Sequence, residues 1–285
     1  GRIVFAFLNG LAAKRQLPES LLGCGFACLL GRFGSTIYPG TIVHLRHCAA
    51  ALWQHKEAHM AQAGIHGLVG VAVRKWAPKA EWLVLGIVLG NLVPDTDNLA
   101  VAVATVAKLP TEGLHRTFTH SLFTIVAILA IFYIIAASTK KARWNMLGIG
   151  LGIGVLMHIL LDLLIWFNGV DILWPIPSWI NLWAGYTPPE WFDKLMLPVE
   201  YLFLAVYFLL LYSLAQKHKT DQDYRKVLLA WTILQAVLFV LFTVLVYTMS
   251  KGFTTINGVV YLFSLFLAIG VTIRARRTVE VRKAA

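Results

Sequence analysis

The chain has 285 residues, of which 58% are hydrophobic and only 14% are charged, and its mean hydropathy is +0.70. These values exclude an ordinary soluble globular protein and predict a polytopic membrane protein. The formal net charge is +11, but the basic residues cluster just beyond apolar runs. That pattern is typical of membrane loops, so we expect no nucleic-acid binding.

Residues 1–59 differ in kind from the rest of the chain. All three cysteines lie here, so neither a disulfide framework nor a cysteine metal site is expected in the main body. Met60 opens a more regular sequence, and Lys56-Glu57 can be encoded by a ribosome-binding sequence suitably placed for a start there. We expect residues 1–59 to be a non-native or disordered N-terminal extension. The alternative is a genuine extension whose apolar stretches are short for a membrane span.

From residue 60 onward the pattern is almost wholly helical. Short apolar segments come first, and then a loop and four or five longer apolar runs. The longer runs reach the roughly 20 residues that cross about 30 Å of hydrocarbon. The expected spans are 118–138, 145–167, 196–215, 227–249 and 256–273.

Lysine and arginine are unevenly distributed between the loops. The loops 139–143 and 216–226 and the tail after residue 273 hold nearly all the positive charge, whereas 168–194 and 250–255 hold one lysine each. The first set is therefore predicted to be cytoplasmic. The tryptophan-rich loop 168–194 is then expected at the outer interface, where indole rings prefer to lie.

His158 and Asp162 interrupt the apolar run GVLMHILLDLLIWF. Their spacing puts both side chains on one face of a helix, about 5–6 Å apart at Cβ. Ionisable groups inside a membrane helix are costly and are usually functional. The structural alternative is a private hydrogen bond between the two side chains.

The segment LVPDTDN supplies two more carboxylates, Asp95 and Asp97. The non-helical backbone expected around Pro94 would point both side chains to the same side, as residues i and i+2 do in extended chain. The alternative for Asp97 is a cap on the helix that follows.

The motif LHRTFTHS stands at the start of a long apolar run and contributes His115, Arg116 and His120. Arg116 suits a phosphate oxyanion, and its alternative role is an anchor at the membrane interface. His115 lies about 140° around an ideal helix from His120, so it can join the same site only if the helix begins after it. His66, in GIHGLVG, is either a further ligand or a structural helix-start histidine.

A helical rise of about 1.5 Å per residue places the motifs PDTD, LHRTFTHS and HILLD at one level, on one side of the membrane. Imidazole nitrogens and carboxylate oxygens without a thiolate suit zinc, with manganese or iron as alternatives. With one open position, such a metal lowers the pKa of a bound water to about 7. The sequence therefore predicts a divalent metal site, with enough ligands for one metal or for a pair.

The segments GNLVPDTDN, HRTFTHS and MHILLDLL, followed by LWP, resemble the bacterial LexA-regulated, membrane-bound metal-dependent hydrolase family. That family is grouped at long range with zinc-dependent phospholipase C and the P1-type nucleases. The resemblance covers about residues 60–178. The metal ligands that it implies are His66, Asp97, His120, His158 and Asp162. The residues that it implies next to those ligands or on the substrate are Asp95, His115 and Arg116.

The chain departs from the family pattern beside the histidine–aspartate pair. Met157 replaces a small residue, and Ile165 replaces a threonine whose hydroxyl would orient the aspartate in relatives. The further histidines and glutamate that complete the three-zinc site of phospholipase C are also missing after Asp162. A complete three-zinc site is therefore not expected.

The sequence thus predicts an all-α, polytopic transmembrane helical bundle, with short re-entrant or interfacial helices carrying a His/Asp metal site. Residues 60–195 are expected to form a metal-dependent hydrolase core with two full spans, and 196–285 to add C-terminal transmembrane helices and a basic tail. The expected function is hydrolysis of a phosphoester, in a small molecule or a lipid, by metal-activated water. The expected location is the bacterial cytoplasmic (inner) membrane, among membrane lipids, with the site near the outer leaflet and the basic loops and C-terminus cytoplasmic.

Two other functions remain open at this point. The first is a metal-binding membrane protein without hydrolytic turnover, such as a transporter. A transporter should spread polar groups along several spans, and the last three spans are nearly free of them. A structural scaffold with a His–Asp polar knot would retain no stoichiometric metal.

Overall fold

The computed structural model describes residues 62–167, 169–249 and 251–281, and the predictions made for residues 1–59 lie outside it. The described residues belong to one compact unit. They are mainly helical, which confirms the expected all-α bundle, and the strands among them form one short hairpin.

The described elements follow one another as a series of short and then long helices. The α-helices are α4 (Ala63–Ala72), α5 (Leu83–Leu92), α6 (Asn98–Ala107), α7 (Leu122–Thr139), α8 (Ala142–Ile165), α9 (Glu190–His218), α10 (Arg225–Thr248), α11 (Phe253–Arg274) and α12 (Arg276–Glu280). The 3₁₀ helices are η1 (Val73–Lys75), η2 (Pro94–Asp97), η3 (Phe118–His120) and η4 (Gln222–Tyr224). The antiparallel strands are β1 (Val170–Asp171) and β2 (Trp179–Ile180).

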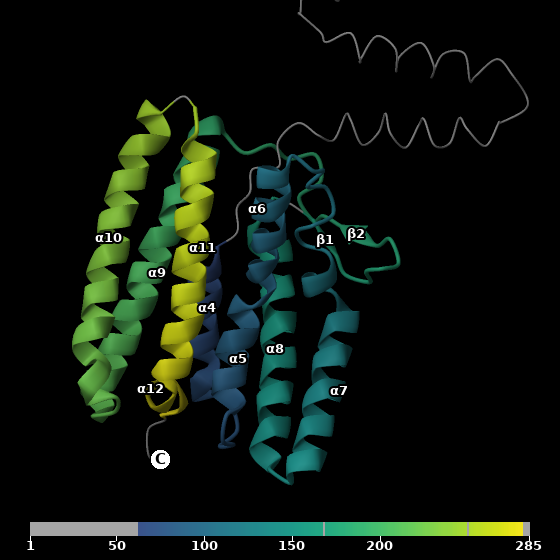
Figure 1. The fold of residues 1–285 in the computed structure, drawn as a ribbon, viewed down its shortest axis with the longest axis vertical. Helices are drawn as coiled ribbons and strands as arrows, with labels where there is room; N and C mark the ends of the chain where they lie inside the picture. The colour runs from purple at the N-terminus through teal and green to yellow at the C-terminus, as the bar shows by residue number, and fades with distance from the viewer. Residues whose placement is uncertain (1–61, 168, 250, 282–285) are drawn as a thin grey trace, which may run out of the picture. The chain divides into compact units, whose positions relative to one another are not determined.

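Five helices are long and apolar enough to cross a membrane: α7, α8, α9, the segment Gln222–Thr248 that contains α10, and α11. They coincide with the five apolar runs expected from the sequence. Figure 1 shows α4 and α5 between the α9–α11 group and the α7–α8 pair. All ten residues of α5 are buried, so this short helix is enclosed by the longer ones.

The helices α5 and α8 meet backbone to backbone. A Cβ atom added at Gly90 would lie 2.2 Å from the carbonyl oxygen of Leu151, and one at Gly154 would lie 2.7 Å from Cα of Gly90. Gly86 and Gly150 make the same kind of contact one turn away. Small residues four apart allow this close approach of membrane helices, and they fix the height of α5 against α8.

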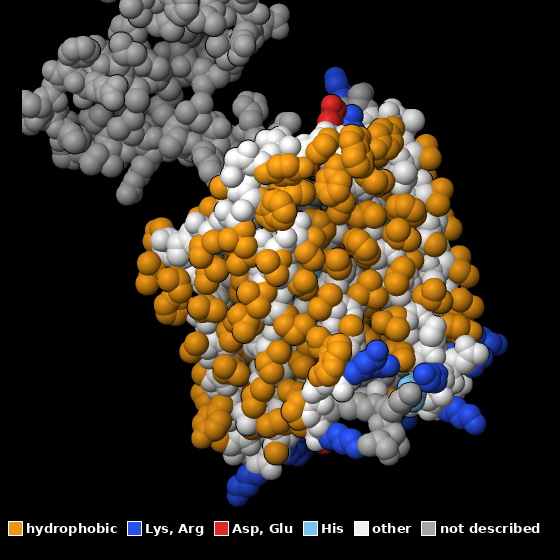
Figure 2. All heavy atoms as spheres, turned by 180° about the vertical axis from the view of Figure 1, so that it is seen from behind, with side chains coloured by type: hydrophobic (Ala, Val, Ile, Leu, Met, Phe, Trp, Pro, Cys, Tyr) orange, Lys and Arg blue, Asp and Glu red, His pale blue; other side chains and the backbone are white. Residues whose placement is uncertain are grey.

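The outer surface of the described part suits a hydrocarbon solvent. Figure 2 shows a face covered with hydrophobic side chains, with lysine and arginine gathered mostly towards one end. At the start of α8, Arg143 pairs with Glu81 and lies over the ring of Trp82, 4.4 Å from its centroid. The apolar belt and the basic end are the features expected of a membrane protein.

One local expectation was wrong. The backbone that begins at Pro94 is a 3₁₀ helix, not an extended segment, so Asp95 and Asp97 do not point to the same side in the way that extended residues do. Both side chains are nevertheless buried, and each has its own set of neighbours.

Candidate metal site

The predicted site residues meet in one buried cluster. They come from α4, from η2, from the segment that ends in η3, and from α8. Seven of them are buried, and only His115 is partly accessible. The eight residues are His66, Asp95, Asp97, His115, Arg116, His120, His158 and Asp162.

The glycine contact between α5 and α8 orients His158. Asn91 follows Gly90, and its backbone carbonyl lies 2.8 Å from Nδ1 of His158. A carbonyl only accepts hydrogen bonds, so Nδ1 carries the proton and Nε2 of the neutral ring presents a lone pair. The predicted private bond to Asp162 is not formed, because the nearest approach of His158 Nε2 to that carboxylate is 3.7 Å.

Thr119 orients His120 in a similar way. Its hydroxyl lies 2.7 Å from Oδ2 of Asp97 and 2.9 Å from Nδ1 of His120. Because an ionised carboxylate only accepts, the hydroxyl donates to Asp97 and its oxygen accepts from His120 Nδ1–H. In the neutral ring, the Nε2 atom of His120 therefore also presents a lone pair.

The two Nε2 atoms, of His120 and His158, are 3.0 Å apart. Two facing lone pairs at this distance repel each other unless a cation lies within reach of both. Oδ2 of Asp162 is 3.6 Å from His120 Nε2, and Oδ1 of Asp95 is 3.7 Å from His158 Nε2. Donor atoms around one zinc ion are about 3.2–3.6 Å apart, since each lies about 2.0–2.2 Å from the metal in a tetrahedron. The donor set therefore fits a divalent metal.

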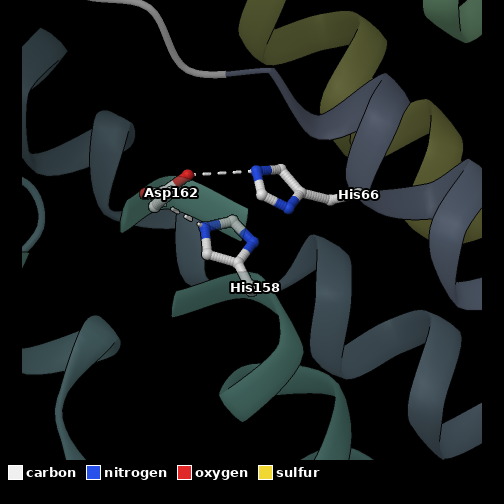
Figure 3. Close-up of side chains that lie close together, drawn as sticks. All are labelled: His66, His158 and Asp162. Carbon is white, nitrogen blue, oxygen red and sulfur yellow. Dashed lines mark ion pairs between the residues drawn. The ribbon is translucent and has the colours of Figure 1, made fainter. Parts of the chain in front are cut away.

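A second group of possible ligands adjoins the first. Figure 3 shows His66 and His158 together on one side of Asp162, and their rings are stacked with centroids 3.8 Å apart. His66 Nε2 lies 3.2 Å from Oδ1 of Asp162, and neither nitrogen of this buried ring has a hydrogen-bond partner among the described residues. Asp162 thus presents one oxygen to His66 and the other to the His120–His158 pair.

The three groups that could hold a metal ion are His66 with His158 and Asp162, Asp95 with His120 and His158, and Asp97 with His115 and His120. Within the described residues, Asp95 Oδ2, Asp162 Oδ2 and His115 Nε2 also lack hydrogen-bond partners. Buried polar atoms of this kind are costly unless something binds them. Their convergence on one place indicates a ligand.

The two aspartates of η2 have different surroundings. Asp97 accepts from His115 Nδ1 at 2.7 Å, from the backbone N–H of Arg116 at 3.1 Å, and from Thr119. Burial raises the pKa of the Asp97 carboxyl, but His115 and His120 outweigh it and hold that pKa well below its usual range. Its side chain makes no capping bond to α6, so the capping alternative is not realised.

Asp95 has no comparable set of donors. Burial and the negative charges of Asp162 and Asp97 raise the pKa of the Asp95 carboxyl well above its usual range. A cation would relieve that repulsion. The resemblance implied Asp97 as a ligand and Asp95 beside the metal. The structure places both carboxylates in groups that could hold a metal ion, Asp95 with His120 and His158 and Asp97 with His115 and His120.

Arg116 faces inward. Its side chain is buried, so the alternative role of an interface anchor is excluded, and its Nε lies 3.4 Å from Oδ2 of Asp162. It occupies the left-handed region with φ of +59°, a conformation that few non-glycine residues adopt. Arg116 and His66 both lie beside Asp162. In the family pattern, a threonine hydroxyl would orient this aspartate.

The start of α7 settles the position of His115. The helix begins at Leu122, and in the described chain between α6 and α7 the one helical turn is η3, so His115 lies on a loop. The helix therefore begins after His115, which is the condition under which the sequence allowed His115 to join the site. His115 contacts Asp97, and its ring lies edge-on to that of His120.

Sequence reasoning missed three residues that support the site. The backbone of Asn91 leaves no signal in the sequence, whereas Thr119 stood inside a recognised motif. Glu200, in the apolar interior of α9, was a readable signal. It is buried, and both its carboxylate oxygens accept from the backbone N–H of Gly64 at 3.0 and 3.1 Å. It thereby holds the start of α4, two residues before His66.

A comparison with family models decides the relationship of the chain. The model of the YdjM inner membrane protein family matches residues 59–277. The chain belongs to this family. The matched range includes every residue of the buried cluster and all five apolar helices of spanning length, so this YdjM-family chain is a multi-pass protein of the bacterial inner membrane. Comparison with the curated proteins and with the solved structures found no match.

Proposed function

We propose that this YdjM-family chain is a metal-dependent hydrolase that cleaves a phosphoester. The observation that carries the proposal is the pair of Nε2 atoms, of His120 and His158, 3.0 Å apart beside the carboxylate of Asp162. In neutral rings both atoms present lone pairs to the same place, and this donor set supports a Lewis-acidic cation because buried polar atoms that converge are costly unless something binds them.

We assign the metal to His120, His158, Asp162 and Asp95, with His66 on the second oxygen of Asp162. Zinc is the expected metal, and manganese or iron are the alternatives. A bound divalent cation supplies a water of pKa about 7 and polarises a phosphoryl oxygen.

The surrounding residues have separate tasks in this proposal. Asn91 and Thr119 fix the tautomers of the two histidines, and Asp97 holds Thr119 and His115. Arg116 neutralises a phosphoryl oxyanion beside Asp162. The Nε2 atom of His115, which has no hydrogen-bond partner among the described residues, accepts or returns a proton at the substrate.

The positive-inside tendency supports an orientation with the basic loops and the C-terminus in the cytoplasm and the site near the outer leaflet. In this orientation, the proposed partners of the protein are membrane lipids and a small-molecule or lipid phosphoester. A fluorescent protein fused after the C-terminus should fold and fluoresce if this orientation holds, and an exported alkaline phosphatase fused there should be inactive.

The test measures metal content and activity on one set of purified proteins. Wild type should retain stoichiometric metal and cleave bis(p-nitrophenyl) phosphate, and H120Q and H158Q should lose both. His218 lies at the end of α9, outside the cluster, so H218Q is the matched control and should keep both. Unchanged metal content in H120Q and H158Q would refute the assigned ligands.

The burial of the cluster favours a second candidate, a metal-binding membrane protein without hydrolytic turnover. The same experiment separates the two. Stoichiometric metal without cleavage of any phosphoester, in a preparation that loses its metal in H158Q, would select the second candidate.

A further inference from the structure

The segment 169–189, which joins α8 to α9, exposes apolar side chains although it is not a spanning helix. It contains the β1–β2 hairpin, and its one charged side chain is Asp171. The exposed fractions of its large apolar residues reach 61%. Those at 40% or more are Leu173, Trp174, Ile176, Trp179, Ile180, Leu182 and Tyr186.

The inner side of this hairpin is attached to the candidate metal site. The N–H of Asp171 donates to the carbonyl of Arg116 at 2.9 Å, and the N–H of Leu122 donates to the carbonyl of Ile172 at 2.8 Å. Val170 is fully buried and packs against apolar residues of α8. The hairpin therefore has a fixed position beside the site.

The turn between the strands is ordered by its one charged residue. Oδ1 of Asp171 accepts from the backbone N–H of Ser178 at 2.8 Å and from its hydroxyl at 2.7 Å. The hydroxyl oxygen of Ser178 in turn accepts from the N–H of Leu173 at 2.6 Å. The carboxylate of Asp171 is thus bound within the turn, where its hydrogen bonds hold the backbone. The side chains on the exposed edge of the hairpin are apolar.

The exposed edge continues onto the surface of a spanning helix. The ring of Phe118, which is 52% exposed, lies edge-on to Trp174 with centroids 5.9 Å apart. Phe118 stands two residues before His120, and the exposed side chains of Leu122 and Phe123 follow at the start of α7. One apolar surface therefore runs from the hairpin, past the metal site, to a helix that faces lipid.

We infer that this hairpin edge, with Phe118, contacts the acyl chains of membrane lipids, and that the neighbouring site acts on an amphiphile embedded in the same membrane. The second half of this inference rests on the proposed function. Continuity with α7 and the lack of charge select lipid as the occupant, since tryptophan and aliphatic side chains with no lysine or arginine suit the border of the hydrocarbon.

Fluorescence quenching tests the lipid contact without any activity. The protein is placed in nanodiscs of phosphatidylcholine whose acyl chains carry bromine close to the headgroup, because bromine quenches tryptophans that it touches. The double variant W174F/W179F should lose part of the quenched amplitude of wild type. W166F removes a tryptophan that is 2% exposed and should leave that amplitude unchanged. A quenched amplitude in W174F/W179F equal to that of wild type would overturn the contact.

Kinetics on two substrates test the substrate class. The metal-loaded protein is assayed on a phospholipid in nanodiscs and on soluble bis(p-nitrophenyl) phosphate. I176S and L182S should lower kcat/KM on the phospholipid about 5- to 10-fold and change it less than about twofold on the soluble ester, because each removes one apolar contact. V240S changes a comparably exposed residue of α10 (61%) and should affect neither.

The possible failures are distinguishable. An equal loss on both substrates, or cleavage of the soluble ester alone by wild type, would overturn the amphiphile assignment while the proposed hydrolysis stands. Cleavage of neither substrate by the metal-loaded protein would overturn the proposed function, and the quenching result would still decide the lipid contact.

Discussion

The two sides of α8 are built differently. Towards α5, the glycines Gly150 and Gly154 bring backbone against backbone, so that an added Cβ would lie within 3.0 Å of main-chain atoms. Towards α7, the contacts are with side chains: a Cβ at Gly148 would lie 2.4 Å from Cβ of Phe132, whereas one at Gly152 would meet only the ends of side chains, the nearest at 3.3 Å. None of the residues of α7 is buried. Main-chain atoms therefore meet on the α5 side of the helix, and on the α7 side its backbone meets side chains.

This difference matches how the two central histidines are placed. His158 depends on the α5 side, where the Asn91 carbonyl is positioned by close backbone packing. His120 comes just before α7 and depends on hydrogen bonds through Thr119 to Asp97. Packing therefore fixes one half of the candidate metal site, and a polar network fixes the other half.

The largest effect should come from filling the α5–α8 contact. G154A places a methyl group 2.3 Å from the carbonyl oxygen of Ile87, which packed backbones cannot accommodate without moving. We expect a loss of about 3 kcal/mol, or roughly 6–12 °C in Tm, measured by circular dichroism in detergent. The matched variant G152A, on the α7 side, should stay within about 1 kcal/mol of wild type. Equal destabilisation by the two variants would contradict the comparison.

A smaller effect is expected from breaking the polar network. T119V keeps the shape of the side chain but removes the hydroxyl that joins Asp97 to His120. Loss of such a supporting hydrogen bond should weaken metal binding about 10- to 100-fold, as measured by competition with a chelator. T119S restores the hydroxyl and should restore the affinity. An unaltered affinity in T119V would show that packing alone orients His120.

The smallest effect should appear as acid sensitivity of the metal-free protein. The pKa of Asp97 is lower in the folded state than its unfolded value of about 4, so its ionised form stabilises the fold above that pH, and this stability is lost as the pH falls below it. Between pH 5 and pH 3 wild type should lose about 1 kcal/mol more than D97N, measured by thermal unfolding. Parallel curves for the two proteins would show that the contacts of Asp97 with His115 and Thr119 add no stability.

Much of the fold was readable from the sequence because its cause is local. Apolar runs of sufficient length predict spanning helices whatever their neighbours are, and the five runs coincide with the five long helices. The spacing of His158 and Asp162 also fixed their shared helical face. The extended backbone expected after Pro94 failed, because a proline in the first turn is equally compatible with a 3₁₀ helix.

The sequence by itself determined which side chains had no reason to lie in a membrane, since an ionisable group in an apolar run is conspicuous without any structure. Only the tertiary structure decided what each of them does. Glycines on two helices set the distance between Asn91 and His158, a hydroxyl one residue away set the tautomer of His120, and the loop before α7 turned Arg116 inward. These outcomes depend on which backbone groups meet across the bundle, and contacts between distant segments leave no periodic signal in the chain.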